Sequence, residues 1–228
     1  MKKIIIPFFC AVLFSVPAAA QKKDAASVKT EAAKSTITAK EVLDNYFKAL
    51  GGKDKLEGVK TLYMENTMSA QGMEISMTTQ KMGNKFKSVQ SLMGQKMVQF
   101  FDGEKGYFDQ MGNKTAIPAD KVVELKKAKP IDALAFDGAV FQNVTAEKLD
   151  GKDYNVLASD KGKFYFDGAT GLLYKTIAGE GNVTIKSYMT ADGIQFPADV
   201  EAEGAGQKVS IKTTKITVNS GVTDADFK

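Results

Sequence analysis

The chain has 228 residues, 31 Lys plus Arg, 27 Asp plus Glu, and no histidine. Every basic residue is a lysine, and tryptophan is absent as well. The chain therefore lacks the commonest general base and zinc ligand, and it lacks the guanidinium fork that binds phosphate or carboxylate in two-point contacts. The near-neutral balance of charge gives no reason to expect nucleic acid or an anionic membrane surface as the main partner.

The first twenty residues have the pattern of a secretory signal peptide. Met1-Lys2-Lys3 is positively charged, Ile4 to Val16 is apolar, and Ala18-Ala19-Ala20 supplies a small-residue cleavage site. The apolar run is too short to span a bilayer. We expect export, cleavage after Ala20, and a mature chain without a transmembrane segment.

The only cysteine, Cys10, lies inside this apolar run, so the mature chain has neither a disulfide nor a lipid-modified cysteine. Its stability in an oxidising compartment must come from packing. Removal of Lys2 and Lys3 takes the 31 basic residues to 29 against 27 acidic ones, a net charge of about +2.

Residues 21–35 are polar and rich in alanine and lysine, which predicts a flexible leader outside the fold. We expect one domain over residues 36–228. It begins with a helix of about three turns, because Thr38 and Glu41 match a capping box and Gly51-Gly52 supplies a stop. The apolar residues of this helix recur at helical spacing and are Val42, Leu43, Tyr46, Phe47 and Leu50.

Apolar and polar residues then alternate from Val59 to Gln110, which predicts about five antiparallel strands separated by glycine-containing turns. The part from Leu62 to Phe101 is rich in methionine, a flexible side chain that recurs on adaptable binding surfaces. An ordinary filled core is the alternative interpretation, and the pattern leaves both open.

A second helix is predicted from Pro118 to Ala128, with Val122, Val123 and Leu125 as its apolar residues. Alternation returns from Val144 to Val218 with several hairpin signals. The predicted fold class is α+β, mainly antiparallel β: an unclosed, strongly curved β-barrel of about eleven strands, with two or three helices covering its concave face. Because the connections are short, we expect one continuous meander.

Catalysis by a serine–histidine or cysteine–histidine pair is not available to this chain. Asp102-Gly103-Glu104, with Asp109 nearby, is typical of a turn rather than an acid/base pair. Asp167 to Gly171 is typical of a turn and lacks the further oxygens of a calcium loop. The methionines are spread over separate strands, which disfavours copper. We expect no metal, no cofactor and no enzymatic activity.

Apolar recognition is the remaining chemistry, since large apolar side chains recur at strand positions and the helices are too short to cover a sheet of this length. The candidate ligand-binding residues are Tyr46, Met64, Met68, Met73, Ile75, Met77, Phe86, Met97, Phe101, Phe108, Phe164 and Phe166.

Several short segments carry a resemblance to a known family. They are Tyr46 to Leu56, Gln71-Gly72-Met73, Phe101-Asp102-Gly103, Gly106-Tyr107, Gln110-Met111-Gly112, Tyr165-Phe166-Asp167, Thr170-Gly171-Leu172, Asp192 to Pro197 and Val218 to Phe227. In these segments the chain resembles the outer-membrane-lipoprotein-sorting-like proteins of Bacteroidota, within the LolA/LolB superfamily. The resemblance covers nearly all of residues 38–228.

The resemblance implies an unclosed antiparallel barrel with helices over an apolar cavity, a periplasmic location, and a lipid or the acyl chain of a lipoprotein as partner. The LolA sorting proteins rely on an arginine near the lid, and this chain has none, so no functional residue is carried over. A similar segment ends some secreted insulinase-type metallopeptidases, which implies an accessory role.

The sequence thus predicts a periplasmic, non-enzymatic carrier of a lipid or acylated polypeptide. The alternative is an interaction or sensor module whose partner is another envelope protein, possibly accessory to a secreted peptidase, without a lipid-transfer role.

Overall fold

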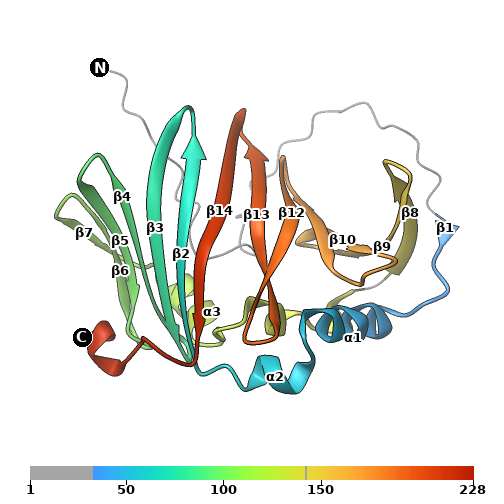
Figure 1. Ribbon diagram of the computed structural model, residues 1–228, viewed down its shortest axis with the longest axis horizontal. Coiled ribbons are helices and arrows are strands. Elements are labelled where there is room, and N and C mark those ends of the chain that lie inside the picture. The colour runs from blue at the N-terminus through green and yellow to red at the C-terminus, as the bar shows by residue number, and fades with distance from the viewer. Residues whose placement is uncertain (1–32, 142) are drawn as a thin grey trace.

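The computed structural model describes residues 33–141 and 143–228, and one sheet of fourteen strands dominates them (Figure 1). The predicted signal peptide lies outside the described residues, as does most of the predicted leader. The strands are β1 Ala33–Lys34, β2 Thr61–Ala70, β3 Met73–Met82, β4 Lys85–Leu92, β5 Gln95–Phe101, β6 Gly106–Gln110, β7 Asn113–Ala116, β8 Asn143–Leu149, β9 Lys152–Ser159, β10 Gly162–Asp167, β11 Leu173–Ala178, β12 Gly181–Ala191, β13 Ile194–Gly204 and β14 Gln207–Val218.

The sheet is antiparallel and unclosed, which confirms the predicted fold class. Its order is β1-β8-β9-β10-β11-β12-β13-β14-β2-β3-β4-β5-β6-β7. The expectation of one continuous meander is wrong, because β14 pairs with β2 while β7 and β8 lie at or near opposite edges. The strand count exceeds the predicted eleven in part because β1 and β7 are too short to show an alternating pattern.

Over the described residues, three α-helices and three 3₁₀ turns accompany the sheet. They are α1 Ala39–Leu50, α2 Lys53–Glu57, α3 Ala119–Leu125, η1 Asp132–Ala135, η2 Gly138–Val140 and η3 Asp224–Phe227. The chain between β7 and β8, which contains α3, η1 and η2, crosses from one half of the sheet to the other beneath the strands (Figure 1). We call residues 117–141 the crossover segment.

Helix α1 forms as the sequence predicts. The backbone N–H of Glu41 donates to Thr38 Oγ1 at 3.2 Å and that of Thr38 donates to Glu41 Oε2 at 2.7 Å, so the capping box is present. The helix ends at Gly51, where φ is 123° and a Cβ would lie 2.5 Å from the Gly193 carbonyl oxygen. Only glycine suits this close approach of the helix end to the β12–β13 hairpin.

Two faces of the sheet can be followed from strand to strand, because directly opposed residues of antiparallel strands point to the same side. We call the side that bears Leu62, Leu157 and Val200 the inner face. The apolar residues of α1 are buried in the same core cluster as these three, which is the largest cluster among the described residues. Val122 and Leu125 of α3 pack on Phe86 and Phe101, which lie on the same face by register.

Helix α3 is shorter than predicted and less embedded. It ends at Leu125 rather than Ala128, and Val123, a predicted apolar contact, is 57% exposed. A helix of seven residues presents only one narrow stripe to the sheet, and Val122 and Leu125 occupy it.

The outer face is covered in part by the end of the chain. Val222 and Phe227 are buried against Phe100, and Lys85 Nζ lies 2.6 Å from Asp224 Oδ1. The helices and η3 therefore pack on opposite faces.

Leu157 tests the packing under α1, because it is fully buried (0% exposed) on the inner face of β9. We expect Leu157→Ala to lower the free energy of unfolding by about 2–5 kcal/mol, the range for a large-to-small change in a core. Urea denaturation measures it, with the exposed Val123→Ala as a control that should change stability by less than about 0.5 kcal/mol. Equal effects would contradict this packing.

Candidate functional site: the inner face of the sheet

The register of the sheet places every strand residue of the predicted binding set on the inner face. Met64 is opposite Thr79, Met68 opposite Ile75, and Ala70 opposite Met73, all across β2 and β3. Phe86 is opposite Phe101 across β4 and β5, and Phe164 is opposite Leu157 across β9 and β10. The remaining members follow the same register, and they are Met77, Met97, Phe108 and Phe166. That any of them binds a ligand stays a prediction.

One part of this face is filled by aromatic side chains beneath α1. The Tyr46 ring lies 5.1 Å from that of Phe166 in an edge-on arrangement, and Phe136 lies 5.3 Å from Phe164. Phe136 and Phe141, from the crossover segment, complete this cluster. Sequence reasoning did not single out these two, because they lie in an apolar but irregular stretch. Tyr46, Phe164 and Phe166 thus contribute to a packed core.

A second part lies beneath α3. Phe86 and Phe101 stack with ring centroids 6.1 Å apart, and Ile117 is buried with them. Phe108 packs at the margin of this cluster. The crossover segment therefore covers this end of β4, β5 and β6.

A third part is formed by strands alone. Met68, Ile75 and Val209 make a buried cluster, and the residues packed around it are Ala70, Leu92 and Ile211. Within the part of the chain that the structure describes, no helix contributes to this cluster. Met73 lies next to this cluster, opposite Ala70 at the end of the strands where β2 turns into β3. This part of the predicted binding set therefore packs without a contribution from the described helices.

Polar residues separate the second and third parts. Asn66, Thr79, Ser88, Gln90 and Gln99 are all buried and all lie on the inner face. Sequence reasoning missed them, although the inner positions of β4 read Phe86, Ser88, Gln90 and Leu92, which mixes polar residues into an apolar phase. We call these five residues the polar band.

A buried lysine fastens the crossover segment to the inner face. Lys81 Nζ lies 2.6 Å from Asp132 Oδ1, and the lysine side chain is only 9% exposed. Lys81 comes from β3 and Asp132 from η1. A buried ammonium needs a partner, so this ion pair helps to hold η1 against the strands.

The titratable groups under α1 are kept neutral. Burial, and secondarily the nearby charge of Asp132, raises the pKa of Tyr46 far above its usual range. Burial likewise raises the pKa of Tyr188, whose hydroxyl donates to the Leu173 carbonyl at 2.6 Å. Neither phenol is suited to proton transfer near neutral pH.

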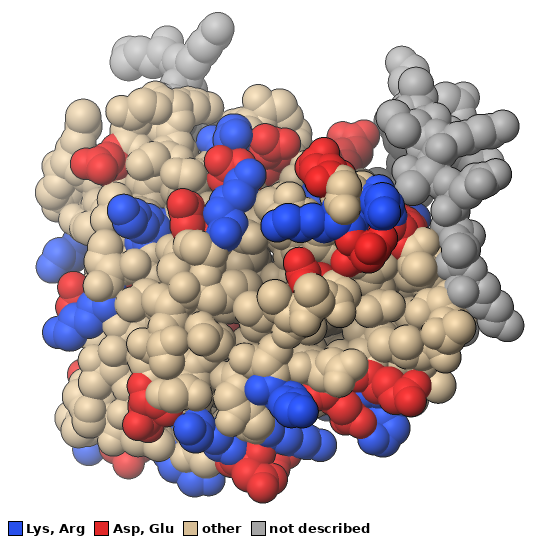
Figure 2. All heavy atoms as spheres, turned by 45° about the vertical axis from the view of Figure 1, so that its right-hand side comes forward, with Lys and Arg blue, Asp and Glu red and all other residues tan. Residues whose placement is uncertain are grey.

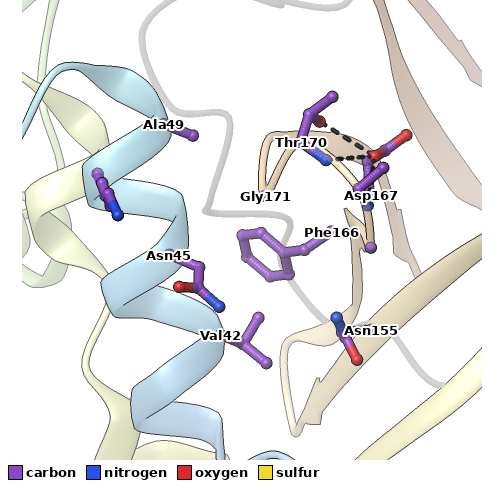
Figure 3. A pocket seen from close by; sticks show the side chains of 11 residues that line it. Val42, Asn45, Ala49, Asn155, Phe166, Asp167, Thr170 and Gly171 are labelled. Atoms are coloured by element: carbon purple, nitrogen blue, oxygen red, sulfur yellow. Dashed lines mark hydrogen bonds between the residues drawn. The ribbon is translucent and has the colours of Figure 1, made fainter.

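A groove of about 460 Å³ opens between α1 and the β10–β11 turn (Figure 3). Phe166 and Val42 lie between helix and turn, and Asn45 and Asn155 add amide groups. The Asp167 carboxylate is already used by the turn, because its Oδ1 accepts from the backbone N–H groups of Ala169 and Thr170. The groove therefore presents apolar and amide surface, with Lys48 and Thr170 also in its lining.

Of the carboxylates considered for catalysis, Asp102 and Asp109 accept hydrogen bonds within turns, and Glu104 pairs with Lys126. Asp102 Oδ1 accepts from the backbone N–H groups of Glu104 at 2.8 Å and Lys105 at 2.9 Å. The hydrogen bond from Lys105, with that from Glu104, holds the pKa of Asp102 below its usual value. Asp109 Oδ1 accepts from Gly112 N at 2.9 Å. Both Asp102 and Asp167 have the turn role that the sequence predicted.

Lysines and carboxylates are interspersed on the face shown in Figure 2, with uncharged surface between them. Over the described residues, no three His, Cys, Asp or Glu side chains gather in a metal-binding group. None of the helices in this part of the chain is long and apolar enough to cross a membrane.

Comparison with known proteins places the fold. No protein-family model matches the chain, and no curated protein matches it. Solved structures do. A domain from Vibrio parahaemolyticus, assigned to outer membrane lipoprotein sorting, is 13% identical with a TM-score of 0.56, over 83% of this chain and 97% of that one.

Two further solved structures have a similar fold. A DUF1329 family protein from Desulfovibrio piger is 13% identical with a TM-score of 0.53, over 85% of this chain and 98% of that one. A LolA superfamily protein from Nitrosomonas europaea is 12% identical with a TM-score of 0.51, over the same shares. The chain therefore has the fold of LolA-superfamily and lipoprotein-sorting proteins, as the resemblance implied.

The ion pair at Lys81 gives a direct test of how the crossover segment is held. We expect Asp132→Ala to lower the free energy of unfolding by about 2 kcal/mol, because it leaves a buried ammonium without a partner. The double variant Lys81→Met/Asp132→Ala should recover more than half of this loss, since methionine fills the space without a charge. Urea denaturation of both variants measures the coupling, and strictly additive effects would contradict it.

Proposed function

We propose that this protein is a periplasmic, non-enzymatic carrier that binds an acyl chain on the inner face of its sheet. The observation that carries the proposal is the cluster of Met68, Ile75 and Val209, to which none of the described helices contributes. Met64, Met73, Met77 and Met97 lie on the same face of the sheet. Flexible thioether side chains suit a ligand without fixed shape.

The energetics favour binding. A saturated chain of about fourteen carbons gains ~10 kcal/mol on burial at ~0.8 kcal/mol per methylene. The loss of translational and rotational freedom, with ordering of side chains, opposes this by several kcal/mol. An affinity in the micromolar range is therefore the expected result.

The fold supports the same function. The similar structures include a domain assigned to lipoprotein sorting and a LolA superfamily protein. For this chain, we propose a lipid or an acylated polypeptide as the ligand. The more specific placement among the lipoprotein-sorting-like proteins of Bacteroidota rests on the sequence resemblance. The signal peptide predicted over residues 1–20 supports export to the periplasm.

Organic extraction of the purified mature protein, followed by mass spectrometry, tests the proposal. We expect a lipid that co-purifies in stoichiometric amount, or displacement of a fluorescent acyl probe by added lipid. A protein partner recovered in stoichiometric amount without lipid would instead favour the interaction or sensor module. Absence of both lipid and probe binding would overturn the carrier function.

Met68 separates a ligand-binding role from a core role. We expect Met68→Asp to weaken binding of a fluorescent acyl probe at least tenfold, because the new carboxylate would lose its water when the acyl chain of the probe packs on it. The matched control is Met93→Asp at a turn, where the side chain is 90% exposed and binding should be unchanged. Urea denaturation of both variants accompanies the titration. If Met68→Asp unfolds the protein, Met68→Gln replaces it; unchanged binding in a folded variant would favour the plain core interpretation.

A further inference from the structure

The polar band forms a continuous row across three strands. Thr79 of β3 is directly opposite Ser88 of β4, and Ser88 is directly opposite Gln99 of β5. Thr79 Oγ1 and Ser88 Oγ are 3.5 Å apart. The three residues are 6%, 2% and 6% exposed, so the row is withdrawn from bulk water.

The next row of the inner face extends the band. Gln90 is 5% exposed and lies opposite Met77, which in turn lies opposite Asn66. Asn66 Oδ1 accepts a hydrogen bond from Thr213 Oγ1 at 2.9 Å. Amides and hydroxyls thus occupy two adjacent rows, between the Phe86–Phe101 cluster on one side and the Met68–Ile75 cluster on the other.

One atom in this band has no partner among the described residues. Gln99 Oε1 is fully buried and accepts no hydrogen bond from residues 33–141 or 143–228. A buried amide oxygen without a donor is unfavourable, and nearly all such groups in native proteins are paired. A core that only needed to be filled would be better served by an apolar residue here. The oxygen is therefore poised for a donor that a ligand brings.

The band is also uncharged. Its members are amides and hydroxyls. Lys81 follows Thr79 on the inner face of β3, and this buried lysine is already paired with Asp132. A carboxylate head group would be buried there without a cation to balance it. The site thus suits a neutral group that carries an O–H or N–H donor.

We propose that the polar band binds the uncharged linkage at the head of the acyl ligand, with Gln99 Oε1 accepting from an O–H or N–H group beside the ester or amide carbonyl. This deepens the proposed function and rests on it. The acyl chain then extends over the Met68–Ile75 cluster. The protein accordingly selects acylglycerols or N-acyl amides over free fatty acids and over esters without a donor.

A displacement series tests the selection. A fluorescent acyl probe on the mature protein is displaced by four compounds of equal chain length: monoacylglycerol, N-acyl alaninamide, fatty-acid methyl ester and free fatty acid. We expect at least one of the first two to bind about fivefold tighter than the methyl ester, the ratio that one hydrogen bond supplies. Preference for the glycerol compound indicates a free glyceride, and preference for the amide indicates an acylated polypeptide.

Variants assign the effect to the band. Gln99→Leu should abolish the preference while the methyl ester still binds as in the parent protein. If Gln99→Leu does not fold, Ser88→Ala takes its place and should likewise reduce the preference. Gln195→Leu and Ser76→Ala, on the outer face of β13 and β3, are the matched controls and should keep the preference.

The outcomes separate the two proposals. Equal binding of all four compounds, or a preference that survives in folded Gln99→Leu, overturns the polar band as a binding element and leaves the acyl carrier intact. Failure of any acyl probe to bind overturns both.

Discussion

The pairing of β14 with β2 is the interaction on which the rest of the molecule depends. It runs from Val209 opposite Ala70 to Val218 opposite Leu62, and it joins two runs of consecutive strands into one sheet. Because opposed residues share a face, this register makes the aromatic cluster under α1 continuous with the methionines of β2 and β3. It also separates β7 from β8, so the crossover segment must run between the two halves of the sheet, and there it covers Phe86 and Phe101. The cover of the inner face is a consequence of the strand order.

The inner face that results differs in chemical character from one part to the next. Rigid aromatic rings pack under α1, where neutral Tyr46 and Tyr188 contribute bulk without acid–base chemistry. Met68 lies in a cluster to which none of the described helices contributes, and the buried polar band lies between this cluster and the Phe86–Phe101 cluster under α3. A face that only stabilised the fold would not require buried amides in the middle of it. The ligand that we propose, with an apolar chain and a neutral polar linkage, would match both features.

The sequence predicted much of this fold, because period and turn chemistry are local. Thr38, Glu41 and Gly51 predict α1, and the alternation from Leu62 to Phe101 predicts β2 to β5 and which side chains of a strand share a face. Which of the two faces is the inner one was left open by the sequence. The strand order was not predictable, since the pairing of β14 with β2 joins residues far apart in the chain. Helix α3 was overestimated because Val123 fits an apolar pattern yet is exposed. The polar band was missed because a search for apolar side chains passes over Ser88, Gln90 and Gln99. Phe136 and Phe141 were missed because their contacts depend on where the crossover segment lies.

The most direct test of the central claim uses the methionines themselves. With methionine methyl groups labelled by ¹³C, NMR spectra of the mature protein can be recorded with an acyl chain that carries a paramagnetic label near its end. Binding on the inner face predicts strong broadening of the signals of Met64, Met68, Met73 and Met77, while Met82 on the outer face and Met93 and Met111 at exposed turns stay sharp. Broadening of the second group alone, or no broadening at saturating probe, would contradict the account.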